Sequence, residues 1–126
     1  MTRNAIHWFE IPVADIDRAQ HFYETLFAQD LRREQMGPQT LAVFPYEHGQ
    51  GVGGALLHSS TAPKPGTEGP LVYLNASPSL DAVLSRAAEL GAKVLLPKRE
   101  LPGDIGFIAQ IVDSEGNRVG LHSPAA

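Results

Sequence analysis

The stretch Ile6-His7-Trp8-Phe9-Glu10-Ile11-Pro12-Val13-Ala14-Asp15 sets the plan of the first half of the chain. Its first eight residues are rich in apolar and β-favouring side chains, and the proline near their end is typical of a strand that runs to a sheet edge. Asp15 is a good helix N-cap, and Asp17 suits the positive end of a helix dipole. Apolar residues then recur at helical spacing, namely Ile16, Ala19, Phe22, Tyr23, Leu26 and Phe27. The pattern predicts a strand over residues 6–13 followed at once by a helix.

Three further strands are expected before the middle of the chain, over residues 31–35, 41–45 and 52–58. The turn formers Gly37-Pro38 and His48-Gly49-Gln50-Gly51 separate them. Residues 59–70, which are rich in Pro, Gly and Ser, have the composition of a linker. The first half therefore consists of a strand, a helix and three strands.

The second half repeats this order. Residues 71–76 favour a strand, either Ser79 or Ser77 is suited to N-cap the helix that follows, and Gly91 supplies a left-handed helix stop. Residues 93–96, 107–112 and 118–122 predict three strands, and the turn Asp113-Ser114-Glu115-Gly116-Asn117 joins the last two. Residues 97–106 predict a long loop of the kind that serves as a lid or binding loop. Its Lys98 and Arg99 either attract an anionic ligand or are ordinary surface charges.

The two halves match weakly but in register at an offset of about 64 residues, which pairs Ile16 with Leu80 and Ala19 with Val83. Units this small gain by burying their sheets against each other. We therefore expect an α+β fold in which two βαβββ modules form an open, curved mixed sheet around a cavity. The expected organisation is a single domain over residues 1–126, with one module at about 1–60, a linker at about 61–70 and a second module at about 71–126.

Composition excludes several classes of protein. The 126 residues are 43% hydrophobic and 19% charged, a balance that supports a packed core. The net charge of −4 is too acidic for a general nucleic-acid binder. There is no cysteine, so thiolate metal sites, disulfides and cysteine nucleophiles are impossible. The N-terminus lacks an apolar stretch of signal-peptide or membrane-helix length, so we expect a soluble, cytoplasmic protein that does not bind membranes.

Two stretches of the chain resemble a known superfamily. They are Ile11-Pro12-Val13-Ala14-Asp15, followed by Arg18-Ala19 and Phe22-Tyr23, and the hairpin Val112-Asp113-Ser114-Glu115-Gly116-Asn117. Together with the doubled plan they resemble the vicinal oxygen chelate superfamily of glyoxalase I, bleomycin-resistance proteins, fosfomycin-resistance enzymes and extradiol dioxygenases. The resemblance covers nearly the whole chain and implies an open cup of two βαβββ modules that usually holds a divalent metal.

The resemblance also locates the four positions that usually bind this metal. One of them matches Trp8, one matches Leu71, one falls within residues 55–57 and one matches Gly120. None of these side chains offers a lone pair suited to a divalent cation. We therefore predict no metal and no other cofactor, and the departure counts against ordinary glyoxalase chemistry, which depends on the metal.

Other residues are candidates for a site inside the cup. Strand alternation places Glu10 on the same face as Trp8, and a carboxylate there needs water, a hydrogen-bond donor or a role as a catalytic base. By the same alternation His122 follows Gly120 on one face of the last strand, while Tyr73 and Asn75 share a face of the strand at 71–76. The candidate ligand-binding residues are Trp8, Glu10, Tyr73, Asn75, Phe107 and His122, and Glu10 is also the candidate catalytic residue. Each also has a purely structural interpretation as a core or surface residue.

Three hypotheses of function follow. The first is a protein of the glyoxalase and bleomycin-resistance type that binds a small, partly apolar molecule without a metal. The second is a lyase, isomerase or dioxygenase that uses a displaced metal site or Glu10 as a metal-free base. The third is a ligand-sensing regulatory module. The sequence leaves it open whether the protein is an enzyme, while the resemblance and the unpaired sheet edges favour a homodimer.

Overall fold

The computed structural model describes residues 4–47 and 49–126, so the predicted turn residue His48 lies outside the described residues. Its elements, in chain order, are β1 (Trp8–Pro12), α1 (Ile16–Phe27), β2 (Arg32–Met36), β3 (Gln39–Val43), β4 (Gly53–His58), β5 (Tyr73–Asn75), α2 (Leu80–Glu89), β6 (Lys93–Leu101), β7 (Gly106–Val112) and β8 (Arg118–Ser123).

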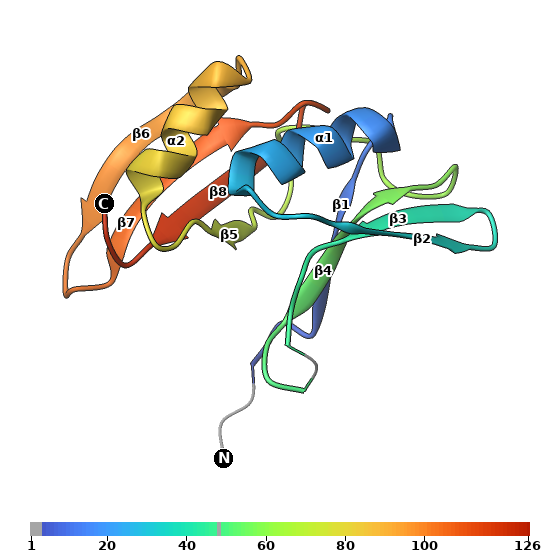
Figure 1. Ribbon diagram of the computed structural model, residues 1–126, viewed down its shortest axis with the longest axis horizontal. Coiled ribbons are helices and arrows are strands. Elements are labelled where there is room, and N and C mark those ends of the chain that lie inside the picture. The colour runs from blue at the N-terminus through green and yellow to red at the C-terminus, as the bar shows by residue number, and fades with distance from the viewer. Residues whose placement is uncertain (1–3, 48) are drawn as a thin grey trace.

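The strands form two four-stranded mixed sheets with the same topology. The first has the order β1-β4-β3-β2 and the second the order β5-β8-β7-β6. In each sheet the first strand pairs in parallel with the last strand of its module, and the other pairs are antiparallel. Figure 1 shows the two sheets extending away from each other, with α1 between them and α2 against the second sheet. The prediction of an α+β fold of two open βαβββ modules is confirmed, with two separate sheets in place of one continuous sheet.

Local signals in the sequence explain where both helices begin. The Asp15 carboxylate accepts a hydrogen bond from the Arg18 amide at 3.0 Å, and the Ser79 hydroxyl accepts one from the Ala82 amide at 3.1 Å. These are N-caps, and Ser79 is the residue used of the two serines considered. Gly91 adopts a φ of +75° directly after α2, as expected for a left-handed helix stop.

The main core lies between the helices and the sheet faces that they cover. Phe22, Tyr23 and Leu26 of α1 pack there with Leu56 of β4 and Leu121 of β8. The helices also contact each other, and the Arg86 guanidinium donates a hydrogen bond to the Leu26 carbonyl at 2.8 Å. Of the helices in the described part of the chain, none has the length and apolar character needed to span a bilayer.

The prediction of a long loop over residues 97–106 is wrong. β6 continues through these residues to Leu101, and only a short turn connects it to β7. Pro97 is tolerated because β6 is an edge strand and its pairing shifts register between Leu96 and Arg99, where a missing amide proton breaks no ladder bond. Lys98 forms an ion pair with Asp81 of α2 at 2.9 Å, which leaves no lid at this place.

The strands at 6–13 and 71–76 are also shorter than predicted. β1 covers Trp8–Pro12 and β5 covers Tyr73–Asn75. Both are edge strands, and backbone hydrogen bonds continue just beyond them, from the Val13 amide to the Leu57 carbonyl at 2.9 Å and from the Ala76 amide to the His122 carbonyl at 2.7 Å.

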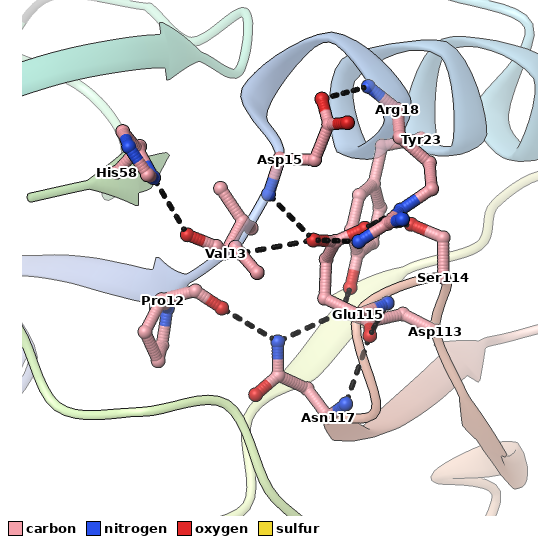
Figure 2. Close-up of polar contacts among 11 residues, drawn as sticks. Pro12, Val13, Asp15, Arg18, Tyr23, His58, Asp113, Ser114, Glu115 and Asn117 are labelled. Atoms are coloured by element: carbon pink, nitrogen blue, oxygen red, sulfur yellow. Dashed lines mark hydrogen bonds and ion pairs between the residues drawn. The ribbon is translucent and has the colours of Figure 1, made fainter.

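Polar side chains join the two modules where α1 meets the β7–β8 hairpin, and we call Arg18, Tyr23, Asp113, Glu115 and Asn117 the junction network. The Glu115 carboxylate accepts hydrogen bonds from the Ala14 and Asp15 amides at 2.9 and 2.8 Å, and it forms an ion pair with Arg18 at 2.6 Å. Figure 2 shows these contacts at the start of α1. The hairpin of the second module thereby caps the positive end of the first module's helix.

The rest of the junction network surrounds Asp113. Its carboxylate accepts a hydrogen bond from the Tyr23 hydroxyl at 2.6 Å and from the backbone amides of Glu115 and Asn117, both at 2.8 Å (Figure 2). The Asn117 side chain donates to Asp113 and to the Pro12 carbonyl, and it accepts from the Gly66 amide. The stretch expected to be a linker is therefore anchored to the hairpin.

Acid should weaken the junction network through Glu115. Burial raises the pKa of this carboxyl, but the hydrogen bonds from Arg18, Asp15, Ser114 and Ala14 outweigh it and lower the pKa from 4.5 to about 2. A lowered folded-state pKa contributes stability above the unfolded value and loses it as the pH falls toward the folded value. Because Arg18 is half exposed and screened by solvent, we expect a contribution of about 2 kcal/mol at neutral pH.

The measurement is urea denaturation of the wild type and of Glu115→Gln across the acid range. The gap in unfolding free energy between them should be full at neutral pH and should close as the pH falls from about 4.5 to 2. A gap that stays constant over this range would show that the ionised carboxylate is not the stabilising species.

Candidate functional site: a cleft between the modules

A cleft of about 580 Å³ lies between the start of β1 and β4 on one side and β5 on the other. Its lining comes from both modules and includes the aromatic residues Trp8, Phe9, Phe27, Phe44 and Tyr73. Trp8 is 40% exposed and Tyr73 is 42% exposed, so both rings present surface to a ligand. A concave cleft of this size is typical of small-molecule sites.

The cleft also has polar groups, and Gln29, Asn75 and Ser77 contribute polar side chains to its lining. Asn75 uses its side-chain oxygen to accept a hydrogen bond from the Ser77 amide at 2.9 Å. Uncharged polar groups in a cleft orient a ligand without making the site specific for charge.

Tyr73 also faces a second hollow of about 360 Å³, which it shares with Leu101, Ile108 and His122. Its hydroxyl accepts a hydrogen bond from the Gln110 side chain at 2.8 Å, which holds the ring across the face of the second sheet. The ring lies directly over Gly120, its partner in the β5–β8 pairing, and a methyl group added at Gly120 would overlap it. Tyr73 thus connects both hollows.

A similar packing occurs in the first module. The Phe9 ring covers Gly54, its neighbour in the β1–β4 pairing, and the Tyr46 ring covers Gly53. These two glycines have a packing role, because the absent side chains make room for aromatic rings on the neighbouring segments.

Of the residues predicted to bind a ligand, Trp8, Tyr73 and Asn75 line the cleft, and their binding role stays a prediction. Glu10 is exposed and accepts a hydrogen bond from the Trp8 indole at 3.2 Å, but it does not line the cleft. His122 lies in the second hollow, where its ring nitrogen is 2.8 Å from the Ile105 carbonyl oxygen.

Phe107 is not brought to this site. Its ring is half-buried against the main core, on the helix-covered side of the second sheet. The Lys98 ammonium lies 5.8 Å from the ring centroid. The register of a strand decides which face of the sheet each side chain occupies, and Phe107 occupies the same face as the buried Ala109 and Ile111.

Sequence reasoning missed Phe9, Phe27 and Phe44 as lining residues. Alternation placed Phe9 on the face opposite Trp8, yet both line the cleft because it opens at the edge of the sheet, beside β1. Phe27 ends α1, and Phe44 directly follows β3. The signal present in the sequence was the aromatic character of these three residues, which lie at or near the ends of their elements.

The family model of the glyoxalase/bleomycin resistance protein/dioxygenase superfamily matches this chain over residues 5–121. The chain belongs to this superfamily. The resemblance drawn from the two sequence stretches is thereby confirmed, and those stretches contain all five residues of the junction network. No curated protein matches the chain.

Solved structures of this superfamily have the same fold. A glyoxalase/bleomycin resistance protein from Streptomyces sp. CB03234 is 24% identical, with a TM-score of 0.72 over 94% of this chain and 100% of that one. TnmS3, an antibiotic binding protein from the same organism, is 26% identical, with a TM-score of 0.66 over 98% of both chains. Glyoxalase I from Zea mays is 23% identical, with a TM-score of 0.64 over 93% of this chain. The present chain spans only 45% of the maize enzyme.

The positions that match the superfamily's metal ligands do not fit a metal. Trp8 and Leu71 line the cleft with an indole and an alkyl group, and the Tyr73 ring occupies the space above Gly120. The β4 residues expected to include the fourth position are Ala55, Leu56 and Leu57, all buried and apolar. Within residues 4–47 and 49–126, no three His, Cys, Asp or Glu side chains come together in a way that could hold a metal ion.

Proposed function

We propose that this protein binds a small, partly apolar and aromatic molecule in the cleft between its modules, without the metal site typical of its superfamily. The observation that carries the proposal is the aromatic lining contributed by both modules, with the exposed rings of Trp8 and Tyr73 on it. Flat aromatic surfaces bind flat ligands through stacking and apolar burial. The likeness to TnmS3, an antibiotic binding protein, supports the binding of a small molecule.

Binding can be followed through Trp8 itself, because it is the only tryptophan of the chain and lies in the cleft. The probe is 8-anilinonaphthalene-1-sulfonate, which gains fluorescence in apolar sites and accepts energy from tryptophan. We expect saturable binding with quenching of Trp8. Wild-type protein that neither binds this probe nor shows quenching with a panel of flat aromatic antibiotics would contradict the proposal.

Replacing Tyr73 with alanine should weaken probe binding about tenfold, since it removes an aromatic face of the cleft. The matched control is Val94→Ala, which truncates an apolar side chain of similar exposure, 45% against 42%, on the edge strand β6 away from the cleft. It should leave affinity unchanged. Equal losses in the two variants would mean that the probe reports general surface hydrophobicity.

The alternative function is a lyase, isomerase or dioxygenase that uses a displaced metal or Glu10 as a base. Its support is superfamily membership, together with the position of Glu10 beside Trp8. Elemental analysis of protein loaded with Mn, Fe, Ni and Zn distinguishes the hypotheses. Stoichiometric metal that is lost in Glu10→Gln or His122→Gln would favour the enzyme, whereas absence of metal with intact probe binding would favour the binding protein. The hypothesis of a ligand-sensing module requires a partner protein, which co-purification would reveal.

We further propose that the protein forms a homodimer in the cytoplasm. The exposed Trp8 and Tyr73 rings and the unpaired edges of β1, β2, β5 and β6 offer surface for a second copy. Sedimentation equilibrium across a range of protein concentrations tests the assembly, and cell fractionation tests the location. A single species with the mass of one chain at all concentrations would overturn the dimer.

A further inference from the structure

Three cleft-lining residues, Phe9, Phe27 and Phe44, form an aromatic wall of the cleft. Tyr23 lies behind this wall. It is fully buried on α1 and does not belong to the cleft lining. Its ring stacks on Phe27, with centroids 6.3 Å apart and an interplanar angle of 16°, and meets Phe44 edge-on at 5.6 Å. Phe44 in turn lies 5.7 Å from Phe9. All three phenylalanines line the cleft, so each lining ring of this wall is one or two ring contacts away from Tyr23.

The other end of Tyr23 is anchored in the second module. Its hydroxyl donates to the Asp113 carboxylate at 2.6 Å, across 90 residues of sequence (Figure 2). Asp113 is held in turn by the amides of its own hairpin, those of Glu115 and Asn117. Burial, and then the negative charge of Asp113, raise the pKa of Tyr23 well above 10, so the hydroxyl remains a donor at physiological pH.

These contacts connect the polar junction between the modules to the wall of the cleft. Protein cores are close-packed, so a ring fixed at its far end by a short hydrogen bond limits the positions open to the rings packed against it. The Tyr23 ring is the part of the junction network that contacts cleft-lining side chains, while the Glu115 carboxylate accepts hydrogen bonds from Arg18, Ser114 and the backbone at the start of α1.

We propose that Tyr23 is a positioning residue for the cleft: its hydrogen bond to Asp113 sets the places of Phe27 and Phe44 and thereby the fit of an aromatic ligand. This inference rests on the proposed function for the identity of the ligand. The placement of the rings does not depend on that function. Coupling of this kind is reciprocal, so a ligand that packs on Phe27 and Phe44 also strengthens the Tyr23–Asp113 contact.

The test is Tyr23→Phe, which keeps the buried ring and removes only the hydroxyl group. We expect the affinity for 8-anilinonaphthalene-1-sulfonate to fall about fivefold. We also expect the NMR signals of the Phe27 and Phe44 rings, observed with labelled phenylalanine, to shift or broaden in the protein without probe. The matched control is Glu115→Gln, which weakens the same junction through a side chain that has no ring contact. It should retain the wild-type affinity and wild-type ring signals.

The outcomes separate this inference from the proposed function. Wild-type affinity and unchanged Phe27 and Phe44 signals in Tyr23→Phe would overturn the positioning role, even if the variant is less stable. An equal loss of affinity in Glu115→Gln would also overturn it, because general loosening of the junction would then explain the effect. If the wild type binds no aromatic probe, the proposed function fails, and the ring signals alone still decide whether Tyr23 positions the wall.

Discussion

Replacing Asp113 with alanine is expected to lower the free energy of unfolding by about 3 to 5 kcal/mol. The substitution removes the acceptor of four hydrogen bonds, which come from the Tyr23 hydroxyl, the amides of Glu115 and Asn117, and the Asn117 side chain. Tyr23 and Asn117 are buried, so water cannot take the place of the carboxylate at these donors. Urea denaturation followed by far-UV circular dichroism measures the loss.

The matched control for this prediction is Asp17→Ala. Asp17 forms an ion pair with Arg33 at 2.8 Å, but its side chain is 84% exposed. Exposed pairs contribute little, so the control should lose only a small fraction of the free energy that Asp113→Ala loses. Similar losses for the two variants would show that the junction network does not hold the modules together. Asp113→Asn should fall between them, since an amide keeps an acceptor for the backbone but places a donor group in the network.

Replacing Gly54 with alanine is the second large effect, with an expected loss of about 2 to 3 kcal/mol. The added methyl group would overlap the Phe9 ring, which lies across Gly54 and packs against Phe44. The ring cannot move away freely, because it is half-buried against the core. Thermal or urea denaturation measures the loss, and probe binding should weaken as well, since Phe9 and Phe44 line the cleft.

Two further glycine variants bracket this result. Gly51→Ala adds a methyl group in open space and should leave stability unchanged. Gly120→Ala would overlap the Tyr73 ring, but that ring is 42% exposed and can swing toward solvent, so stability should fall less than in Gly54→Ala. A neutral Gly54→Ala would mean that Phe9 is not held where the structure places it.

The hairpin at residues 113–117 is among the stretches most useful for recognising the superfamily, and in this structure its side chains make contacts between the modules. Asp113 and Glu115 bind donors on and around α1, and neither lines the cleft. A motif of this kind therefore identifies a fold whose chemistry is decided elsewhere. At the positions where relatives bind a metal, this chain has Trp8, Leu71 and Gly120, and the expectation of a protein without that metal stays a prediction.

Strand alternation explains only part of the cleft lining. Trp8, Tyr73 and Asn75 line the cleft, but so do Phe9 and Leu74 from the opposite faces of their strands, while Glu10, on the same face as Trp8, does not. The failure over residues 97–106 has a local cause, because Pro97 normally ends a strand and the sequence does not reveal that β6 lies at an edge. The position of Phe107 depended on the register of β7, where an error of one residue changes the side of the sheet.

The amino-acid sequence by itself determined the order of the elements, the helix cap at Asp15, the doubled plan and the superfamily, because periodicity, capping and turn chemistry act over a few residues. Only the tertiary structure decided that Phe9 reaches the cleft beside Trp8, that Tyr73 covers Gly120, and that the Tyr23 hydroxyl meets Asp113. These contacts join residues on different strands or in different modules. They depend on how the sheets are set against each other, which no local pattern of residues encodes.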